Sequence, residues 1–85
     1  RYDEVVAQLR LFASAREAAG CSRDVIPGDT VSEVMTEAIS RFGTEFERVL
    51  TSCRVWVNGE VADMGAKLND NDEVAILPPV SGGDQ

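Results

Sequence analysis

The chain has 85 residues, which is enough for one domain, and 44% of them are hydrophobic, which is enough for a globular core. Fifteen acidic residues against eight basic ones give a formal net charge of −7. This charge argues against binding to nucleic acid or to an anionic membrane and is compatible with a basic protein partner. The sequence contains no histidine, so histidine-dependent catalytic pairs and zinc sites of the usual Cys/His spacing are excluded.

The two cysteines, Cys21 and Cys53, lie far apart in the sequence and form no CxxC pair. We expect both to be reduced, half-buried side chains of a cytoplasmic protein. No signal peptide or membrane-spanning apolar run is recognisable, which favours the same location.

The first third of the chain predicts two strands and a short helical segment. Residues 5–12 alternate between two faces, which is typical of a half-buried strand. Residues 13–19 have a helix-forming composition and end at Gly20, which predicts a short helical turn or a structured loop. A second short strand is predicted over residues 22–26, closed by a turn at residues 27–29.

The clearest predicted element is an amphipathic helix that begins after Thr30. Thr30 is a good N-cap, and Glu33 lies at the spacing of a capping box. Apolar residues then recur at helical spacing, namely Val31, Val34, Met35, Ala38, Ile39 and Phe42. Gly43 ends the helix. We expect Val34, Ile39 and Phe42 to be buried against a sheet.

The second half of the chain is predicted to be rich in strands. The first element is a short helical turn whose Phe46, Val49 and Leu50 add to the core. A strand over 54–57, a hairpin turn at Asn58-Gly59 into 60–61, a loop over 63–68, a turn over 69–72 and a last strand over 73–77 follow.

This order of elements predicts an α+β fold of the β-grasp type, the layout of ubiquitin. One main helix would pack on one face of a mixed sheet of four to five strands. We assign residues 1–77 to this domain and residues 78–85 to a flexible C-terminal tail.

Strand parity predicts which side chains face the helix and which face away from it. The helix-facing set is Leu9, Leu11, Val55, Val57, Val74 and Ile76, and the opposite set is Phe12, Trp56, Ala75 and Leu77. Because apolar side chains on an open sheet face mark an interaction surface, Phe12, Trp56 and Leu77 are predicted to bind a partner. Alternatively, a loop half-covers Phe12 and Trp56, or the parity is shifted by one residue.

An uncharged segment, Leu77-Pro78-Pro79-Val80-Ser81-Gly82-Gly83, follows the last predicted strand. The prolines end the strand and hold the backbone extended, and glycine has no Cβ to obstruct passage through a narrow channel. The segment is therefore either a terminal linker or an arm that enters another protein.

Several motifs carry a family resemblance along the chain. They are Leu11-Phe12-Ala13, Arg16-Glu17, Gly20, Val57-Asn58-Gly59, Asp70, Asp72-Glu73-Val74-Ala75 and the segment over 77–83. With these motifs in this order, the chain resembles the small subunit of molybdopterin synthase, the MoaD family of ubiquitin-like sulfur carriers. The segment over 77–83 is the most specific part, because related carriers for thiamine or cysteine synthesis usually lack the double proline.

The resemblance implies that Gly83 carries the chemistry. An ATP-dependent activating enzyme adenylates the terminal carboxylate, and a sulfur donor converts it to a thiocarboxylate. The large synthase subunit then uses two such sulfurs to build the dithiolene of molybdopterin. The carrier itself would bind no cofactor or metal, since ATP belongs to the activating enzyme and the catalytic side chains belong to the partners. The arm that delivers Gly83 would consist of Pro78, Pro79, Val80, Ser81 and Gly82.

The last two residues, Asp84 and Gln85, depart from the family pattern, in which Gly83 is the terminus. Their peptide bond blocks adenylation of Gly83, so the resemblance implies that they are removed. They are a cloning remnant, a maturation extension or the start of a fused large subunit.

Three other functions stay open at this point. The chain could serve thiamine or cysteine synthesis instead. It could be a ubiquitin-like protein modifier, although its single lysine, Lys67, disfavours self-conjugation. It could also be an interaction module whose tail has no chemical role.

Overall fold

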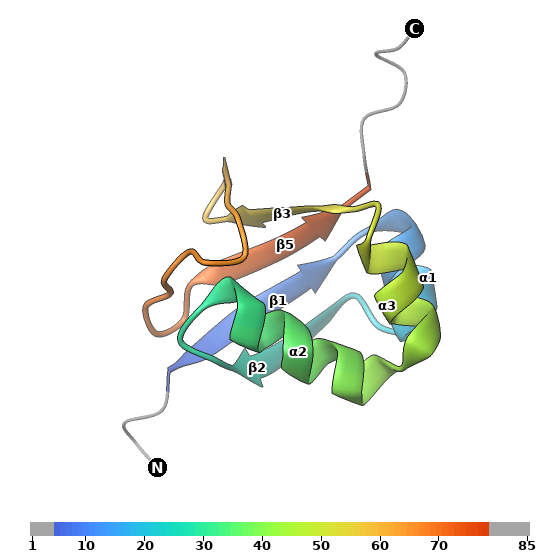
Figure 1. Cartoon of the computed structure of the whole chain (residues 1–85), viewed down its shortest axis with the longest axis horizontal. Coiled ribbons are helices and arrows are strands. Elements are labelled where there is room, and N and C mark those ends of the chain that lie inside the picture. The colour runs from blue at the N-terminus through green and yellow to red at the C-terminus, as the bar shows by residue number, and fades with distance from the viewer. Residues whose placement is uncertain (1–4, 79–85) are drawn as a thin grey trace, which may run out of the picture.

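The computed structural model describes residues 5–78, which form a five-stranded mixed sheet with three helices packed against it (Figure 1). The strands are β1 Val6–Leu11, β2 Arg23–Pro27, β3 Arg54–Val57, β4 Glu60–Val61 and β5 Glu73–Leu77. The helices are α1 Ala13–Ala19, α2 Val31–Phe42 and α3 Thr44–Leu50. The predicted β-grasp fold is confirmed, and the two segments predicted as possible helical turns are helices of seven residues each.

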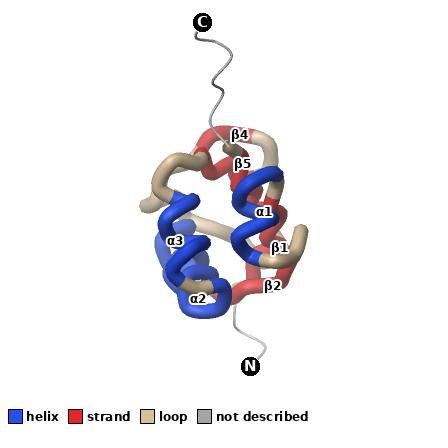
Figure 2. Tube along the Cα trace, turned by 90° about the vertical axis from the view of Figure 1, so that its right-hand side faces the viewer, coloured by secondary structure: helices blue, strands red, loops and turns tan. Residues whose placement is uncertain are grey.

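The strands lie in the order β2-β1-β5-β3-β4, with β1 and β5 paired in parallel at the centre. The pairs β1 with β2, β3 with β5 and β3 with β4 are antiparallel. β2 and β3 therefore run in the same direction, and α2 crosses one face of the sheet between them (Figure 1). α1 and α3 pack against each other at the end of the sheet where β1 and β5 finish (Figure 2).

The local sequence explains both ends of α2. The Thr30 hydroxyl accepts a hydrogen bond from the Glu33 N–H at 3.2 Å, and Glu33 Oε1 accepts one from the Asp29 N–H at 2.7 Å. The helix stops at Gly43, whose φ of +99° favours glycine and whose N–H donates to the Ile39 carbonyl at 2.8 Å. The predicted cap and stop are confirmed, although Glu33 reaches one residue further back than a regular capping box.

The loop between β4 and β5 completes the hydrogen bonding at the start of α2. The Val31 N–H donates to the Ala66 carbonyl at 3.0 Å, and the Ser32 N–H donates to the Met64 carbonyl at 2.9 Å. The sequence predicted only an irregular loop over residues 63–68, because a backbone carbonyl on a distant segment leaves no local signal.

The core lies between the helices and the sheet. Its buried apolar side chains are Ala7, Leu9, Leu11, Ala15, Ile26, Val31, Val34, Met35, Ala38, Phe46, Leu50, Val55, Leu68, Val74 and Ile76. All of the strand residues predicted to face the helix are buried except Val57, which is half-buried and packs against the core. The predicted strand parity is therefore confirmed.

The predicted burial of the α2 stripe is wrong at its C-terminal end. Val34 is fully buried, but Ile39 and Phe42 are only half-buried. Phe46 of α3 is fully buried instead, and Phe42 packs against it edge-on, with ring centroids 5.1 Å apart. The prediction that Phe46 adds to the core is confirmed: α3 begins directly after Gly43, and its aromatic side chain is the one that is fully buried at this end of α2.

Candidate docking surface

The sheet face opposite the helices carries a groove of about 640 Å³. It is lined by Phe12, Trp56, Asn58, Gly59, Glu73, Ala75 and Leu77. Trp56 is paired with Ala75 across β3 and β5, and both alternate with buried residues along their strands. The structure thus brings Phe12, Trp56 and Leu77 together, as the sequence predicted. Their binding to a partner stays a prediction.

Backbone contacts hold Phe12 at the end of this groove. Its N–H donates to the Ile76 carbonyl at 3.2 Å, and its carbonyl accepts from the Ala15 N–H at 3.1 Å. The next residue, Ala13, has a φ of +52°, a conformation that non-glycine residues rarely adopt. This sharp turn between β1 and α1 leaves Phe12 36% exposed on the open face.

The turn of the β3–β4 hairpin also lines the groove, with Asn58 and Gly59. Asn58 and Gly59 have φ values of +51° and +87°, as a type I′ turn requires. The Asn58 N–H donates to the Glu73 carbonyl at 2.8 Å, and Asn58 Oδ1 accepts from the Glu73 N–H at 3.0 Å. The Asn-Gly dipeptide predicted the turn, but the role of the amide side chain was missed because its partner is on a strand distant in sequence.

Asp72 extends this network from the hairpin to the turn before β5. Its carboxylate accepts hydrogen bonds from the Asn69 N–H at 2.8 Å and from Asn58 Nδ2 at 3.0 Å. These bonds, first that of Asn69 and then that of Asn58, hold the pKa of Asp72 below its ordinary value.

The groove lies where β5 ends. Leu77 is the last residue of β5 and lines the groove, and Pro78 follows it. The remaining site residues predicted from the sequence lie outside the described residues, namely Pro79, Val80, Ser81, Gly82 and Gly83 with Asp84 and Gln85. The predicted partner-binding residues are thus next to the start of the predicted arm.

A second hollow of about 490 Å³ lies over β1 and β2 and also reaches β5. Its polar lining consists of Gln8, Arg10, Arg23, Asp24, Asn71 and Glu73, and the Asp24 carboxylate is paired with Arg41 of α2 at 3.2 Å. The sequence analysis did not single out these residues, because only the pairing of the strands brings them together. The alternation of β1 would have placed Arg10 on the outer face.

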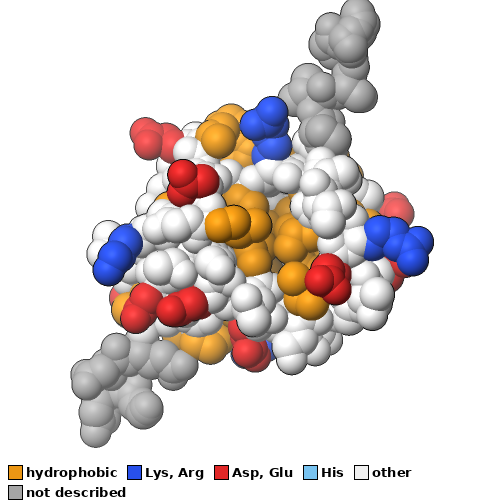
Figure 3. Space-filling view, in the orientation of Figure 1, with side chains coloured by type: hydrophobic (Ala, Val, Ile, Leu, Met, Phe, Trp, Pro, Cys, Tyr) orange, Lys and Arg blue, Asp and Glu red, His pale blue; other side chains and the backbone are white. Residues whose placement is uncertain are grey.

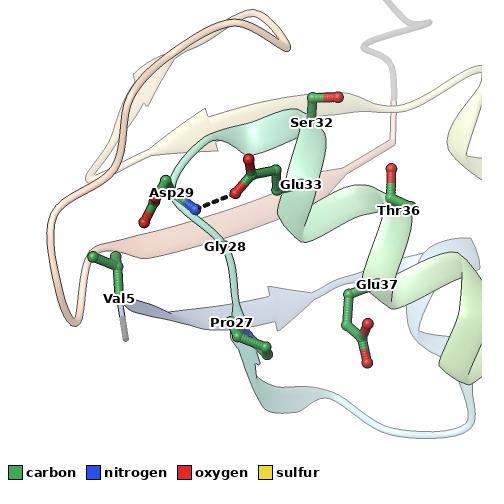
Figure 4. A pocket seen from close by; sticks show the side chains of 8 residues that line it. All are labelled: Val5, Pro27, Gly28, Asp29, Ser32, Glu33, Thr36 and Glu37. Atoms are coloured by element: carbon green, nitrogen blue, oxygen red, sulfur yellow. Dashed lines mark hydrogen bonds between the residues drawn. The ribbon is translucent and has the colours of Figure 1, made fainter. Parts of the chain in front are cut away.

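The helix side of the molecule has a hollow of a different character (Figure 4). It measures about 520 Å³, lies at the start of α2 and is lined in part by Asp29, Glu33 and Glu37. Loop carbonyls and the Thr30 cap already occupy the first N–H groups of α2. With these donors in use and acidic side chains around it, the hollow is unsuited to an anion.

Hydrophobic side chains also gather near the middle of the helix side, with charged side chains around them (Figure 3). A small hollow of about 260 Å³ beside β3 includes Cys53 and the exposed Met64. Burial raises the pKa of the Cys53 thiol, against a smaller lowering by its hydrogen bond with Ser14. A raised pKa disfavours the nucleophilic thiolate.

The described part of the chain offers no metal cluster and no membrane helix. Within residues 5–78, no group of three or more Cys, Asp or Glu side chains is arranged to hold a metal ion. Over the same residues, no helix is both long enough and apolar enough to span a bilayer. Cys21 and Cys53 are both half-buried free thiols.

Known proteins resemble this chain in sequence, and a solved structure resembles it in fold. The molybdopterin synthase sulfur carrier subunit of Pyrenophora tritici-repentis is 36% identical over 78 residues, which cover 85% of this chain and 84% of that protein. The subunit of the same name from Aspergillus niger is 33% identical over 81 residues, covering 89% and 92%. The solution structure of small archaeal modifier protein 1 from Methanosarcina acetivorans has a TM-score of 0.83 at 28% identity, covering 94% of this chain and 98% of that one.

The match to a family profile is equally extensive. The profile of the ThiS family aligns with residues 9–83. This range begins within β1, includes every residue that lines the groove, and ends at the second glycine of the terminal pair. The chain therefore belongs to the ThiS family.

Proposed function

We propose that this chain is a sulfur carrier for molybdenum cofactor biosynthesis, the small subunit of a molybdopterin synthase, with Gly83 as its reactive terminus. One observation carries the proposal: relatives named molybdopterin synthase sulfur carrier subunit match most of the chain at 33–36% identity. The family match supports the assignment of the reactive residue, because it extends to Gly83.

The proposed chemistry needs only a free carboxylate from the carrier. The Gly83 carboxylate attacks the α-phosphorus of ATP on an activating enzyme, and pyrophosphate leaves. A sulfur donor that delivers HS⁻ then attacks the acyl carbon, a C–S bond forms, and AMP leaves with the oxygen that bound it. Activation is required because a carboxylate is a poor electrophile, whereas an acyl adenylate has a good leaving group.

In this proposal, the groove docks the carrier on its protein partners, the activating enzyme and the large synthase subunit. Phe12 and Trp56 offer aromatic surface, which is enriched at the energetic centres of interfaces. Leu77 joins the groove to the arm, so a partner that grips the groove also fixes where the arm begins. Binding energy at the groove would thereby position Gly83 in the partner's active site.

The test compares two forms of the chain, one ending at Gly83 and one ending at Gln85. Each is incubated with the activating enzyme of the same organism, ATP and a sulfide source, and its intact mass is measured. The form ending at Gly83 is expected to gain the mass of one oxygen-to-sulfur exchange, and the longer form is not. Thiocarboxylation of the longer form at Gln85, with equal support of molybdopterin synthesis, would show that a terminal Gly-Gly is not required.

A second function is favoured by the solved structure of an archaeal modifier protein, which superposes on this chain with a TM-score of 0.83. In that case, activated Gly83 would form isopeptide bonds with lysines of other proteins. The two functions are separated by mass spectrometry of lysates that contain the form ending at Gly83. Covalent adducts that depend on Gly83 would favour a modifier, and a thiocarboxylate without adducts would favour the carrier.

Carriers for thiamine or cysteine synthesis remain competitors within the sulfur-transfer class. Incubation with the activating enzyme of each pathway discriminates among them. Under our proposal, the enzyme of the molybdopterin pathway loads Gly83 with sulfur faster than the other two.

A further inference from the structure

The open sheet face differs in charge from the molecule as a whole. The strand register places Arg10, Arg23, Arg54 and Glu73 at its outward positions. These are three cations and one anion, whereas the whole chain has eight basic and fifteen acidic residues. The acidic excess therefore lies elsewhere, and the local field of this face favours anionic groups.

Two of these arginines lie directly opposite each other. Arg10 of β1 pairs with Arg23 of β2 in an antiparallel register, so that both side chains leave the same face of the sheet. Like charges at such positions destabilise a sheet. Arg10 Nη1 lies 3.0 Å from Glu73 Oε2, but Arg23 forms no ion pair with any residue between positions 5 and 78. One positive charge of the pair is thus left for a further anion.

The hollow over β1 and β2, which contains Arg10 and Arg23, and the apolar groove are parts of one surface. Glu73 lines both of them. Its ion-pair partner, Arg10, also lies over the groove residue Phe12, with the guanidinium carbon 5.6 Å from the ring centroid. At the same end of the groove as Phe12, but on the other side of β5, Arg54 is paired with Leu77 across β3 and β5. Cationic side chains therefore flank the groove on two sides.

We propose that this surface docks an acidic segment of a protein partner. An apolar side chain of that segment fills the groove between Phe12 and Trp56, while a neighbouring Asp or Glu side chain binds between Arg10 and Arg23. Guanidinium groups suit this role, because they bind carboxylates in a planar, two-pronged geometry. The net charge of −7 alone would favour a basic partner, but the open face is locally of the opposite sign. The inference rests on the proposed function, which makes the partner the activating enzyme or the large synthase subunit.

The first test reverses one charge and uses a matched control. Arg23→Glu and Arg48→Glu change the net charge equally, but Arg48 is exposed on α3, away from the open face. Binding of each variant, ending at Gly83, to the large subunit and to the activating enzyme is measured at two salt concentrations. We expect Arg23→Glu to bind at least one partner about tenfold more weakly, with a reduced salt dependence, and Arg48→Glu to change its binding less than about twofold.

The second test uses the scarcity of lysine in this chain. Lys67 is the only lysine, so Arg23→Lys adds a unique primary amine to the open face. A carbodiimide, which joins amines to carboxylates without a spacer, is added to the complex, and cross-linked peptides are sequenced. We expect position 23 to be joined to an Asp or Glu of the partner, and Arg48→Lys to give no such product at position 48.

The outcomes separate this inference from the proposed function. If the unsubstituted chain accepts sulfur and binds its partners, but Arg23→Glu and Arg48→Glu bind alike, the acidic docking segment is wrong and the carrier function stands. Absence of a carboxylate cross-link at position 23 in a stable complex also overturns the inference. If the unsubstituted chain neither binds these partners nor accepts sulfur, the proposed function fails as well.

Discussion

The two faces of the sheet carry side chains with different properties. The helix-covered face is aliphatic and closed, with Leu9, Val74 and Ile76 fully buried beneath the helices. The open face combines aromatic and arginine side chains, and its Phe12 is 36% exposed. Because alternate residues of the same strands build the two faces, the stability of this small domain and the proposed docking of a partner should be separable. Substitutions on one face should therefore leave the property of the other face largely intact.

The largest expected effect is on the helix-covered face. Phe46→Ala removes a fully buried ring and should lower the free energy of unfolding by about 3–5 kcal/mol, measured by chemical denaturation. Phe42→Ala is the matched control, since its ring is half-buried and should cost less. Equal losses for the two variants would contradict the division of roles between α2 and α3.

The counterpart on the open face is Phe12→Asp. We expect it to weaken binding to the large synthase subunit and to the activating enzyme by about 2 kcal/mol or more, roughly 30-fold, because it places a charge in the apolar groove. Its thermal midpoint should stay close to that of the unsubstituted chain, since Phe12 is exposed. A folded variant that binds both partners with normal affinity would remove the groove from the docking surface.

A smaller effect is expected at the border between the two faces. Asn58→Ala removes the acceptor for the Glu73 N–H and the donor to Asp72. It also places alanine at a left-handed backbone position, which alanine tolerates less well than asparagine. We expect a loss of about 1–2 kcal/mol in the free energy of unfolding, measured by urea denaturation. Asn58→Gly separates the causes, because glycine relieves the backbone strain but restores no hydrogen bond. If both variants are as stable as the original chain, the amide network does not hold the hairpin.

The smallest expected effect is on the pH dependence of stability, through the carboxylate of Asp72. The pKa of Asp72 is lower in the folded chain than in the unfolded chain, so its carboxylate adds stability above the ordinary pKa, and this is lost as the pH falls through the lowered folded value. The stability difference between the original chain and Asp72→Asn should therefore shrink from about pH 6 to about pH 3. Denaturation curves at several pH values measure it, with Asp63→Asn as a control in an exposed loop. A difference that does not vary with pH would show that the charge of Asp72 is not what stabilises this turn.

Much of the fold could be predicted because its signals are local. Thr30, Glu33 and Gly43 define the ends of α2. Strand alternation places Val55 on the helix-covered face and Trp56 on the open face. The apolar pattern also predicted Phe46 in the core, but the partial exposure of Phe42 could not be predicted, since it depends on how α3 packs at the end of α2. The family resemblance named the terminal segment and Gly83, which no local pattern could assign to sulfur transfer.

The candidate docking surface was only partly predictable, because it too depends on how distant segments pair. Parity placed Phe12, Trp56 and Leu77 on one face, and the structure brings them together. The opposition of Arg10 and Arg23 needs the register of β1 against β2, and the Arg10–Glu73 ion pair needs the parallel pairing of β1 with β5. Neither pairing can be read from composition, and the net charge of −7 indicated only that a basic partner was compatible with the chain.

Reconstituted molybdopterin synthesis tests the central claim, that this chain supplies sulfur for molybdopterin, most directly. The form ending at Gly83 is first loaded with sulfur, and its thiocarboxylate is verified by mass. It is then mixed with the large synthase subunit and the pterin precursor, and molybdopterin is quantified. We predict product in proportion to the thiocarboxylate consumed and little product when Phe12→Asp is used at the same loading. Full loading that yields no molybdopterin with an active large subunit would contradict the proposed function.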